Sequence, residues 1–246
     1  SEPLYDFTGE DGVTHRVWRV DPALNAPMEE AFQNISATYI ADGHHRAASA
    51  VKVCDKRRRE HPDCTGREPF QYFLSVLFPD EELMIMPYHR VVKDLNGLTG
   101  EAFLRRIETC FTVEQVEEAY SPEEKGCFGL YLKGQWYALR AREEIRSQDP
   151  VKGLDVSVLQ DYLLEPVLGI GDPRTDTRID FVGGIRGLGE LEKRCCSDME
   201  IAFSMYPTSI EELLMVADAG LLMPPKSTWF EPKLRSGLFI HRLERS

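Results

Sequence analysis

The chain has 246 residues, of which 42% are hydrophobic, and a formal net charge of −12. This length supports one large domain or two small ones with a real core, and the composition excludes a disordered or fibrous chain. The acidic balance argues against a nucleic-acid backbone as the main partner, because phosphate contacts need clustered lysine and arginine.

The sequence shows no sign of a membrane or secreted protein. No apolar run approaches the roughly 20 residues of a membrane span, and no secretory signal opens the chain. Its six cysteines include no C-x-x-C pair, so zinc fingers and thioredoxin chemistry are not indicated. Reduced thiols in a cytoplasmic protein are expected. The oligomeric state stays open, a homo-oligomer included.

The first expected elements are a β-hairpin and a helix. Residues 14–20 predict a strand that pairs with residues near Leu4 across a turn at residues 9–12. A helix over residues 28–35 then leads to a short buried strand over residues 38–41.

That strand is followed by the sequence Asp-Gly-His-His-Arg and then by a helix expected from Arg46 to about residue 61. A helix start offers unpaired N–H groups and a partial positive charge, which favour anions. Gly43 lets a ligand approach the backbone, and the guanidinium of Arg46 suits phosphate. Asp42 can hold Mg²⁺ against that phosphate. Two histidines can donate hydrogen bonds or move protons near neutral pH, namely His44 and His45.

The alternative is that this turn is only structural. Asp42 would then be the N-cap of the helix, and the two histidines would be satisfied turn residues. Five consecutive polar, small or charged residues between an apolar strand and an alanine-rich helix favour the functional interpretation, a phosphate or nucleotide site. The basic run at residues 56–59 ends the same helix, where it suits the helix dipole better than DNA binding.

The rest of the chain predicts further strands and helices. Strands are expected over residues 70–78, 83–92, 111–116, 127–140 with a hairpin turn at 133–135, 178–182, 200–205 and 238–243. Helices are expected over residues 100–110, 154–168, 188–195 and 209–219, the last with a capping box. We divide the chain into a motif-bearing region, residues 1–150, and a C-terminal region, residues 151–246, that completes the fold.

Three other positions carry candidate ligand-binding groups. His89 and Arg90 either line the same cleft as the motif or are exposed polar residues at a strand end. Arg186 lies in a glycine-rich segment that either approaches an anion or only makes a tight connection. The last group follows two prolines and either contacts phosphate or forms a surface loop: Lys226, Ser227 and Thr228.

Four motifs together resemble a bacterial and archaeal family known as a domain of unknown function: ADGHHR at 41–46, PYHRVV at 87–92, FVGG at 181–184 and MPPKST at 223–228. The resemblance covers nearly the whole chain and implies that a long N-terminal part is missing, in agreement with a first residue that is not methionine. The Asp-Gly-His-His-Arg turn is also similar to the nucleotide-binding turn of the ParB/sulfiredoxin-like superfamily, which includes free-serine kinases.

This resemblance implies an α/β fold of the mixed α+β kind, with a ParB/sulfiredoxin-like nucleotide-binding core and an additional mixed-sheet region. It implies phosphate transfer from ATP or ADP, with Mg²⁺, to a small hydroxyl compound, free L-serine first. Asp42, as metal ligand or base, and His45 would be catalytic, and residues 43–46 would hold the nucleotide phosphates. The carboxylate that takes the hydroxyl proton is not assigned.

Three other functions stay open. The first is a nucleotide-binding regulatory module without catalysis. The second is a DNA-associated partitioning protein, against which the net charge counts. The third is a sulfiredoxin-like reductase, whose cysteine would have to lie near the phosphate turn. The nearest cysteine to that turn, Cys54, is about two turns along the expected helix.

Overall fold

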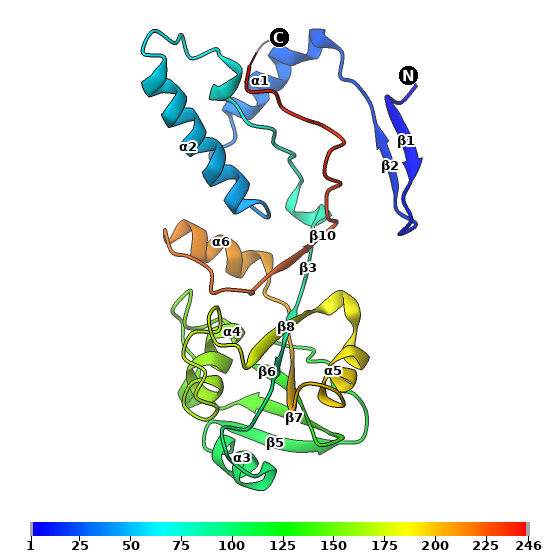
Figure 1. Cartoon of the computed structure of the whole chain (residues 1–246), viewed down its shortest axis with the longest axis vertical. Helices are drawn as coiled ribbons and strands as arrows, with labels where there is room; N and C mark the ends of the chain where they lie inside the picture. The colour runs from blue at the N-terminus through cyan, green and yellow to red at the C-terminus, as the bar shows by residue number, and fades with distance from the viewer. Residues whose placement is uncertain (1, 245–246) are drawn as a thin grey trace. The chain divides into compact units, whose positions relative to one another are not determined.

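The structure is a computed structural model and describes residues 2–244. It consists of helices and antiparallel strands (Figure 1), which confirms the expected mixed α+β class. The chain divides into two compact units between Ile40 and Ala41. The boundary expected at residue 150 lies inside the second unit, where strands from both sides of that position share one sheet.

The first unit contains a β-hairpin and a helix. β1 (Tyr5–Thr8) pairs antiparallel with β2 (Thr14–Val17), which confirms the expected hairpin. A short turn, η1 (Pro22–Leu24), precedes α1 (Asn25–Gln33), the expected first helix. The strand expected over residues 38–41 is wrong, because this segment is irregular. A strand needs a hydrogen-bonded neighbour, and apolar residues alone do not provide one.

The second unit is built around a six-stranded antiparallel sheet in the order β5-β7-β6-β9-β4-β8. Its strands are β4 (Tyr88–Val92), β5 (Phe111–Val116), β6 (Cys127–Leu132), β7 (Gln135–Ala141), β8 (Ile179–Gly183) and β9 (Ile201–Met205). The β6–β7 hairpin turns at Lys133 and Gly134, whose φ angles are 50° and 82°. Positive φ at both positions is the backbone of the tight hairpin turn that the sequence predicts.

Helices pack on both faces of this sheet. They are α3 (Gly100–Ile107), α4 (Asp155–Leu159) with its π-helical continuation η5 (Gln160–Leu164), α5 (Leu188–Cys195) and α6 (Ile210–Asp218). Ser209 and Glu212 form the expected capping box at the start of α6. Single 3-10 turns complete the unit: η2 (Pro69–Gln71), η3 (Asp80–Glu82), η4 (Glu143–Ile145) and η6 (Gly184–Arg186). Within residues 2–244, no helix combines the length and apolarity needed to cross a membrane.

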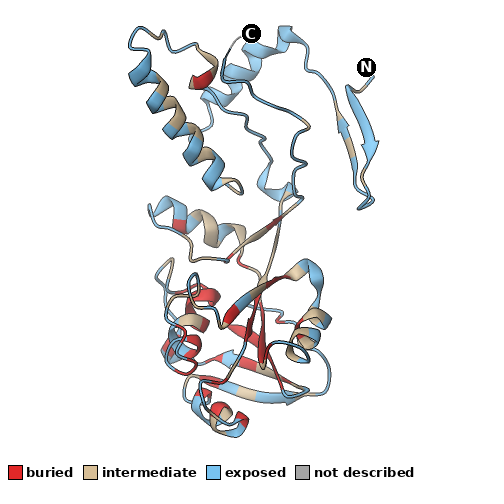
Figure 2. Cartoon of the chain, viewed as in Figure 1, coloured by how far each residue is buried: buried red, intermediate tan, exposed pale blue. Residues whose placement is uncertain are grey.

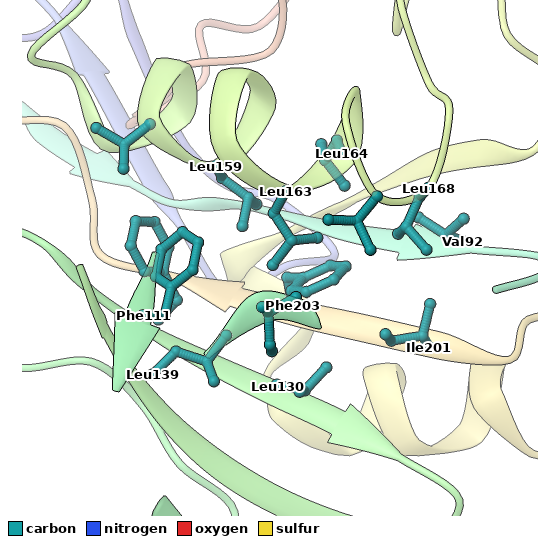
Figure 3. Packing of buried hydrophobic residues seen from close by; sticks show 14 of the residues in the cluster. Val92, Phe111, Leu130, Leu139, Leu159, Leu163, Leu164, Leu168, Ile201 and Phe203 are labelled. Atoms are coloured by element: carbon teal, nitrogen blue, oxygen red, sulfur yellow. The ribbon is translucent and has the colours of Figure 1, made fainter. Parts of the chain in front are cut away.

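Side chains alternate between the two faces of the sheet, as strand geometry requires. In β9, Ile201 and Phe203 pack with leucines of α4 and η5 (Figure 3). Ala202 points the other way and belongs to a second cluster with Leu191 of α5. Figure 2 shows that the buried residues gather on this sheet and its helices, so these elements hold the core of the unit.

Two apolar segments of the second unit form no strand, so the strands expected at 70–78 and 238–243 are wrong. Residues 72–78 are irregular and exposed, and an apolar run shows no pairing partner by itself. The strand expected over residues 83–92 is interrupted at Pro87, which has no N–H for a ladder. β3 (Met84–Met86) pairs with β10 (Trp229–Glu231), whereas β4 joins the large sheet.

Candidate functional site

The Asp-Gly-His-His-Arg turn leads directly into α2 (His44–Glu60). The helix begins two residues earlier than expected, and its N-cap is Gly43, so the alternative of Asp42 as the N-cap is wrong. Gly43 has a φ of 86°, which glycine adopts readily because it has no Cβ. Because Gly43 has no side chain that could cap the helix, the N–H groups of the first turn are available to an external acceptor.

The carboxylate of Asp42 lies just outside this helix start and is exposed. Its Oδ1 accepts a hydrogen bond from the N–H of Gly43 at 2.8 Å, and its Oδ2 lies 3.2 Å from Nζ of Lys233. Partial burial raises the pKa of Asp42, but hydrogen bonds from Lys233 and Gly43, with the charges of Lys233 and Arg46, bring that pKa below its ordinary value. Asp42 is therefore ionised at neutral pH and can bind cations or accept protons.

Lys233 connects Asp42 to two aromatic rings. Nζ of Lys233 lies 5.4 Å from the ring centroid of Trp229, and that ring meets Tyr88 edge-on at 5.3 Å. Nζ of Lys226 lies 5.3 Å from the ring of Tyr88. Burial and then the charge of Asp42 raise the pKa of Tyr88, so the carboxylate acts on that ring as well. We call these five residues the lysine–aromatic cluster.

The glycines at 183 and 184 make room for the ring of Trp229 and for Pro87, respectively. A Cβ on Gly183 would lie 2.7 Å from the ring of Trp229, and one on Gly184 would lie 2.8 Å from Cδ of Pro87. The N–H of Gly184 donates to the carbonyl of Pro87 at 2.8 Å. The segment therefore has a packing reason for its glycines, and this N–H is already paired.

His89 and Arg90 are both buried, so the alternative of exposed polar residues at a strand end is wrong. Nδ1 of His89 accepts a hydrogen bond from the N–H of Met205 at 3.1 Å. Arg90 donates to the carbonyl of Tyr88 and, at 3.2 Å, to that of Lys226. Burial and then the charge of Arg90 lower the pKa of His89 to about 4, and burial lowers that of Arg90 to about 10. The two side chains thus support the strand and the loop that bear the cluster, and a place in a ligand cleft stays a prediction.

The loop at 226–228 presents its three candidate residues differently. Lys226 is exposed and, besides its contact with Tyr88, lines a cavity of about 350 Å³. Ser227 is buried, and its hydroxyl donates to the carbonyl of Pro224 at 2.6 Å. Thr228 is half-buried. The hydroxyl of Ser227 therefore holds the loop in shape, which leaves Lys226 as its most accessible polar group.

The described part of the chain contains no cluster of side chains suited to a resident metal ion. Within residues 2–244, no three His, Cys, Asp or Glu side chains gather in a way that could hold a metal ion. Mg²⁺ that arrives with a nucleotide needs only one or two protein carboxylates besides the phosphates, and Asp42 can supply one. Arg186 is exposed and lies 3.7 Å from Glu190 of α5, so its expected contact with an anion stays a prediction.

Sequence reasoning missed three members of the cluster, namely Tyr88, Trp229 and Lys233. One signal was available for Trp229, because Trp229 and Glu231 alternate along the extended strand β10 and so share a face. The indole N–H of Trp229 donates to Oε1 of Glu231 at 2.7 Å, in agreement with that alternation.

Comparison with solved structures finds distant likenesses. A free serine kinase in complex with AMP is 14% identical to this chain, with a TM-score of 0.42 over 86% of this chain and 80% of that one. A mutant free serine kinase in complex with AMP is 15% identical, with a TM-score of 0.41 over 78% and 66%. A conserved hypothetical protein from Pyrococcus furiosus is 15% identical, with a TM-score of 0.40 over 78% and 68%. Scores at this level do not establish a shared activity.

The chain covers 66% of the length of the mutant free serine kinase, which is less than two thirds. No curated protein matches the sequence. Residues 1–157, more than half of the chain, match a family described as a protein of unknown function, DUF1015. That match includes two of the motifs, at 41–46 and 87–92. The chain therefore belongs to the DUF1015 family.

Proposed function

We propose that this protein transfers a phosphoryl group from ATP or ADP to a small hydroxyl compound, with free L-serine as the first candidate. The observation that carries the proposal is the uncapped start of α2, where the ionised Asp42 lies beside Lys233 and within electrostatic reach of Arg46. Phosphoryl transfer depends mainly on positioning and on neutralisation of charge. A helix start surrounded by cations is suited to both.

Each residue of the turn has a role in this proposal. The N–H groups of residues 44–46 and the side chain of His44 hold the terminal phosphates of the nucleotide. Arg46 offers a planar fork that binds phosphate through two parallel hydrogen bonds. Asp42 binds the Mg²⁺ that accompanies the nucleotide, or accepts a proton, and His45 moves protons near neutral pH.

In this proposal, the other candidate phosphate-binding residues act together with this turn. Lys226 approaches the phosphates from the side of Tyr88, and Arg186 and Thr228 are further candidate phosphate contacts. The choice of free L-serine as acceptor rests on the resemblance of the turn at residues 42–46 to that of free-serine kinases. The carboxylate that takes the proton of the acceptor hydroxyl is unassigned.

The test is formation of the phosphorylated product. The full-length protein is incubated with L-serine and either MgATP or MgADP, and phosphoserine is measured by mass spectrometry. We expect Asp42→Asn to abolish the product. Asp6→Asn is the matched control, because it removes another exposed carboxylate from an ion pair, with Arg16 at 3.1 Å, and we expect it to keep full activity.

A nucleotide-binding regulatory protein without catalysis is the second candidate. The contact that favours it is the ion pair with Lys233, which already engages the carboxylate that catalysis would use. Nucleotide binding without phosphate transfer to serine or to any other small hydroxyl compound would support this second function and contradict the first.

A further inference from the structure

We infer that Lys233 binds the phosphates of a nucleoside di- or triphosphate, and that Asp42 holds its ammonium group in place until the ligand arrives. This inference rests on the proposed nucleotide site. It adds a residue that the sequence motifs did not indicate, from a segment near the other end of the chain.

The ion pair is open to a ligand from solvent. The side chain of Lys233 is 44% exposed and that of Asp42 is 59% exposed, with 3.2 Å between Nζ and Oδ2. An exposed pair of this kind contributes only about 0–1 kcal/mol to stability. Lys233 can therefore exchange a carboxylate for a phosphate without loss of the fold.

The indole ring of Trp229 gives Lys233 a fixed surface on its other side. The ring is held by a hydrogen bond to Glu231 at 2.7 Å, by the edge of Tyr88, and by a close approach to Gly183 that no larger residue would permit. Nζ of Lys233 lies 5.4 Å from this ring, within the range of a cation–π contact. The ammonium group is thus already positioned next to the turn that precedes α2.

Positive charge exceeds negative charge around Asp42. Arg46 and Lys233 both act on its carboxylate, and Lys226 belongs to the same cluster through Tyr88. Three cationic side chains thus lie near two carboxylates, those of Asp42 and of Glu231, whose Oε2 accepts the backbone N–H of Lys233 at 3.0 Å, in a chain whose net charge is −12. A local reversal of this kind attracts anions to one place on an otherwise acidic surface.

A lysine that binds phosphate affects the binding of MgADP and not that of adenosine, which has no phosphate. A lysine that only supports the structure affects the binding of both ligands. We would measure binding of MgADP and of adenosine to the full-length protein by calorimetry, for the wild type, Lys233→Met and Lys233→Arg. Lys193→Met is the matched control, because it removes an exposed lysine that lies 3.7 Å from Glu190 on α5.

We expect Lys233→Met to weaken the binding of MgADP by at least about tenfold, because it removes one charge-assisted hydrogen bond. We expect it to leave the binding of adenosine unchanged. Lys233→Arg should restore most of the affinity, and Lys193→Met should bind as the wild type does.

Equal MgADP affinity in the wild type and in Lys233→Met would overturn the inference and leave the proposed function standing. Loss of adenosine and MgADP binding to the same degree would also overturn it, because the lysine would then be structural. A wild type that binds no nucleotide would overturn both the inference and the proposed function.

Discussion

The ammonium group of Lys233 lies 3.2 Å from the carboxylate of Asp42, although 191 positions separate the two residues along the chain. The contact joins the turn before α2 to the segment after β10. Because the pair is exposed, we expect Asp42→Asn to lower the free energy of unfolding by less than about 1 kcal/mol. Urea denaturation measures this change, and a much larger loss would show that the pair supports the fold rather than a ligand.

The packing of Trp229 on β8 leads to a second prediction. A methyl group at position 183 would lie 2.7 Å from the indole ring, so Gly183→Ala must displace that ring. Overpacking of this kind destabilises by about 1–3 kcal/mol, and the emission of Trp229 should shift as well.

Gly189 is the matched control for this substitution. It lies in α5, and a Cβ there would meet nothing within 4 Å. Since alanine favours the helix over glycine, Gly189→Ala should stabilise the protein by up to about 1 kcal/mol. If Gly183→Ala behaves in the same way as Gly189→Ala in thermal unfolding, the close packing described for Trp229 is contradicted.

His89 makes the stability of the protein depend on pH. Burial and then the charge of Arg90 lower its pKa from 6.5 to about 4. The unfolded chain therefore takes up a proton between these values that the folded chain does not, so stability is lost as the pH falls from 6.5 toward 4. The loss attributable to His89 amounts to about 3 kcal/mol. His89→Gln cannot take up this proton, and its urea denaturation measured across this pH range should lack that loss.

Asp155 changes stability with pH in the opposite direction to His89, over nearly the same pH range. Its two oxygens accept the N–H of Gly126 at 2.9 and 3.0 Å. Burial is the main reason that its pKa is raised from 3.8 to about 6, and the charge of Glu212 adds to it. The folded state thus binds a proton more tightly than the unfolded state, and stability falls as the pH rises from 3.8 through 6, by about 3 kcal/mol.

Asp155→Asn removes this ionisation and keeps an oxygen that can accept the N–H of Gly126. Its free energy of unfolding should therefore exceed that of the wild type at pH 7 and should change less between pH 4 and pH 6. A variant that is less stable than the wild type at pH 7 would contradict the assignment.

The sequence predicts elements well where local signals agree. The start of α6 combines a capping serine and glutamate with apolar periodicity, and the β6–β7 turn has Lys133 and Gly134 at the two positions of positive φ. These features depend only on neighbours in the chain. Residues 72–78 show the limit of such signals, because their apolar pattern predicts a strand and no partner pairs with them.

The candidate site likewise has a part that could be predicted from the sequence and a part that could not. The turn at Asp42 and Gly43 and the helix that follows could be predicted, with the helix start two residues too late, because both depend on residues adjacent in sequence. The contact between Asp42 and Lys233 could not, because it depends on how distant segments fold together. The glycines at 183 and 184 stood out in the sequence, but only the structure shows that they make room for Trp229 and Pro87.

Binding of MgADP to the full-length protein, measured by calorimetry, tests the nucleotide site most directly. The wild type should bind, and Asp42→Ala and Arg46→Ala should each weaken binding by at least about tenfold, because each removes a charged contact to the phosphates or their metal. No binding by the wild type, or binding by both variants as tight as that of the wild type, would contradict a nucleotide site at the start of α2.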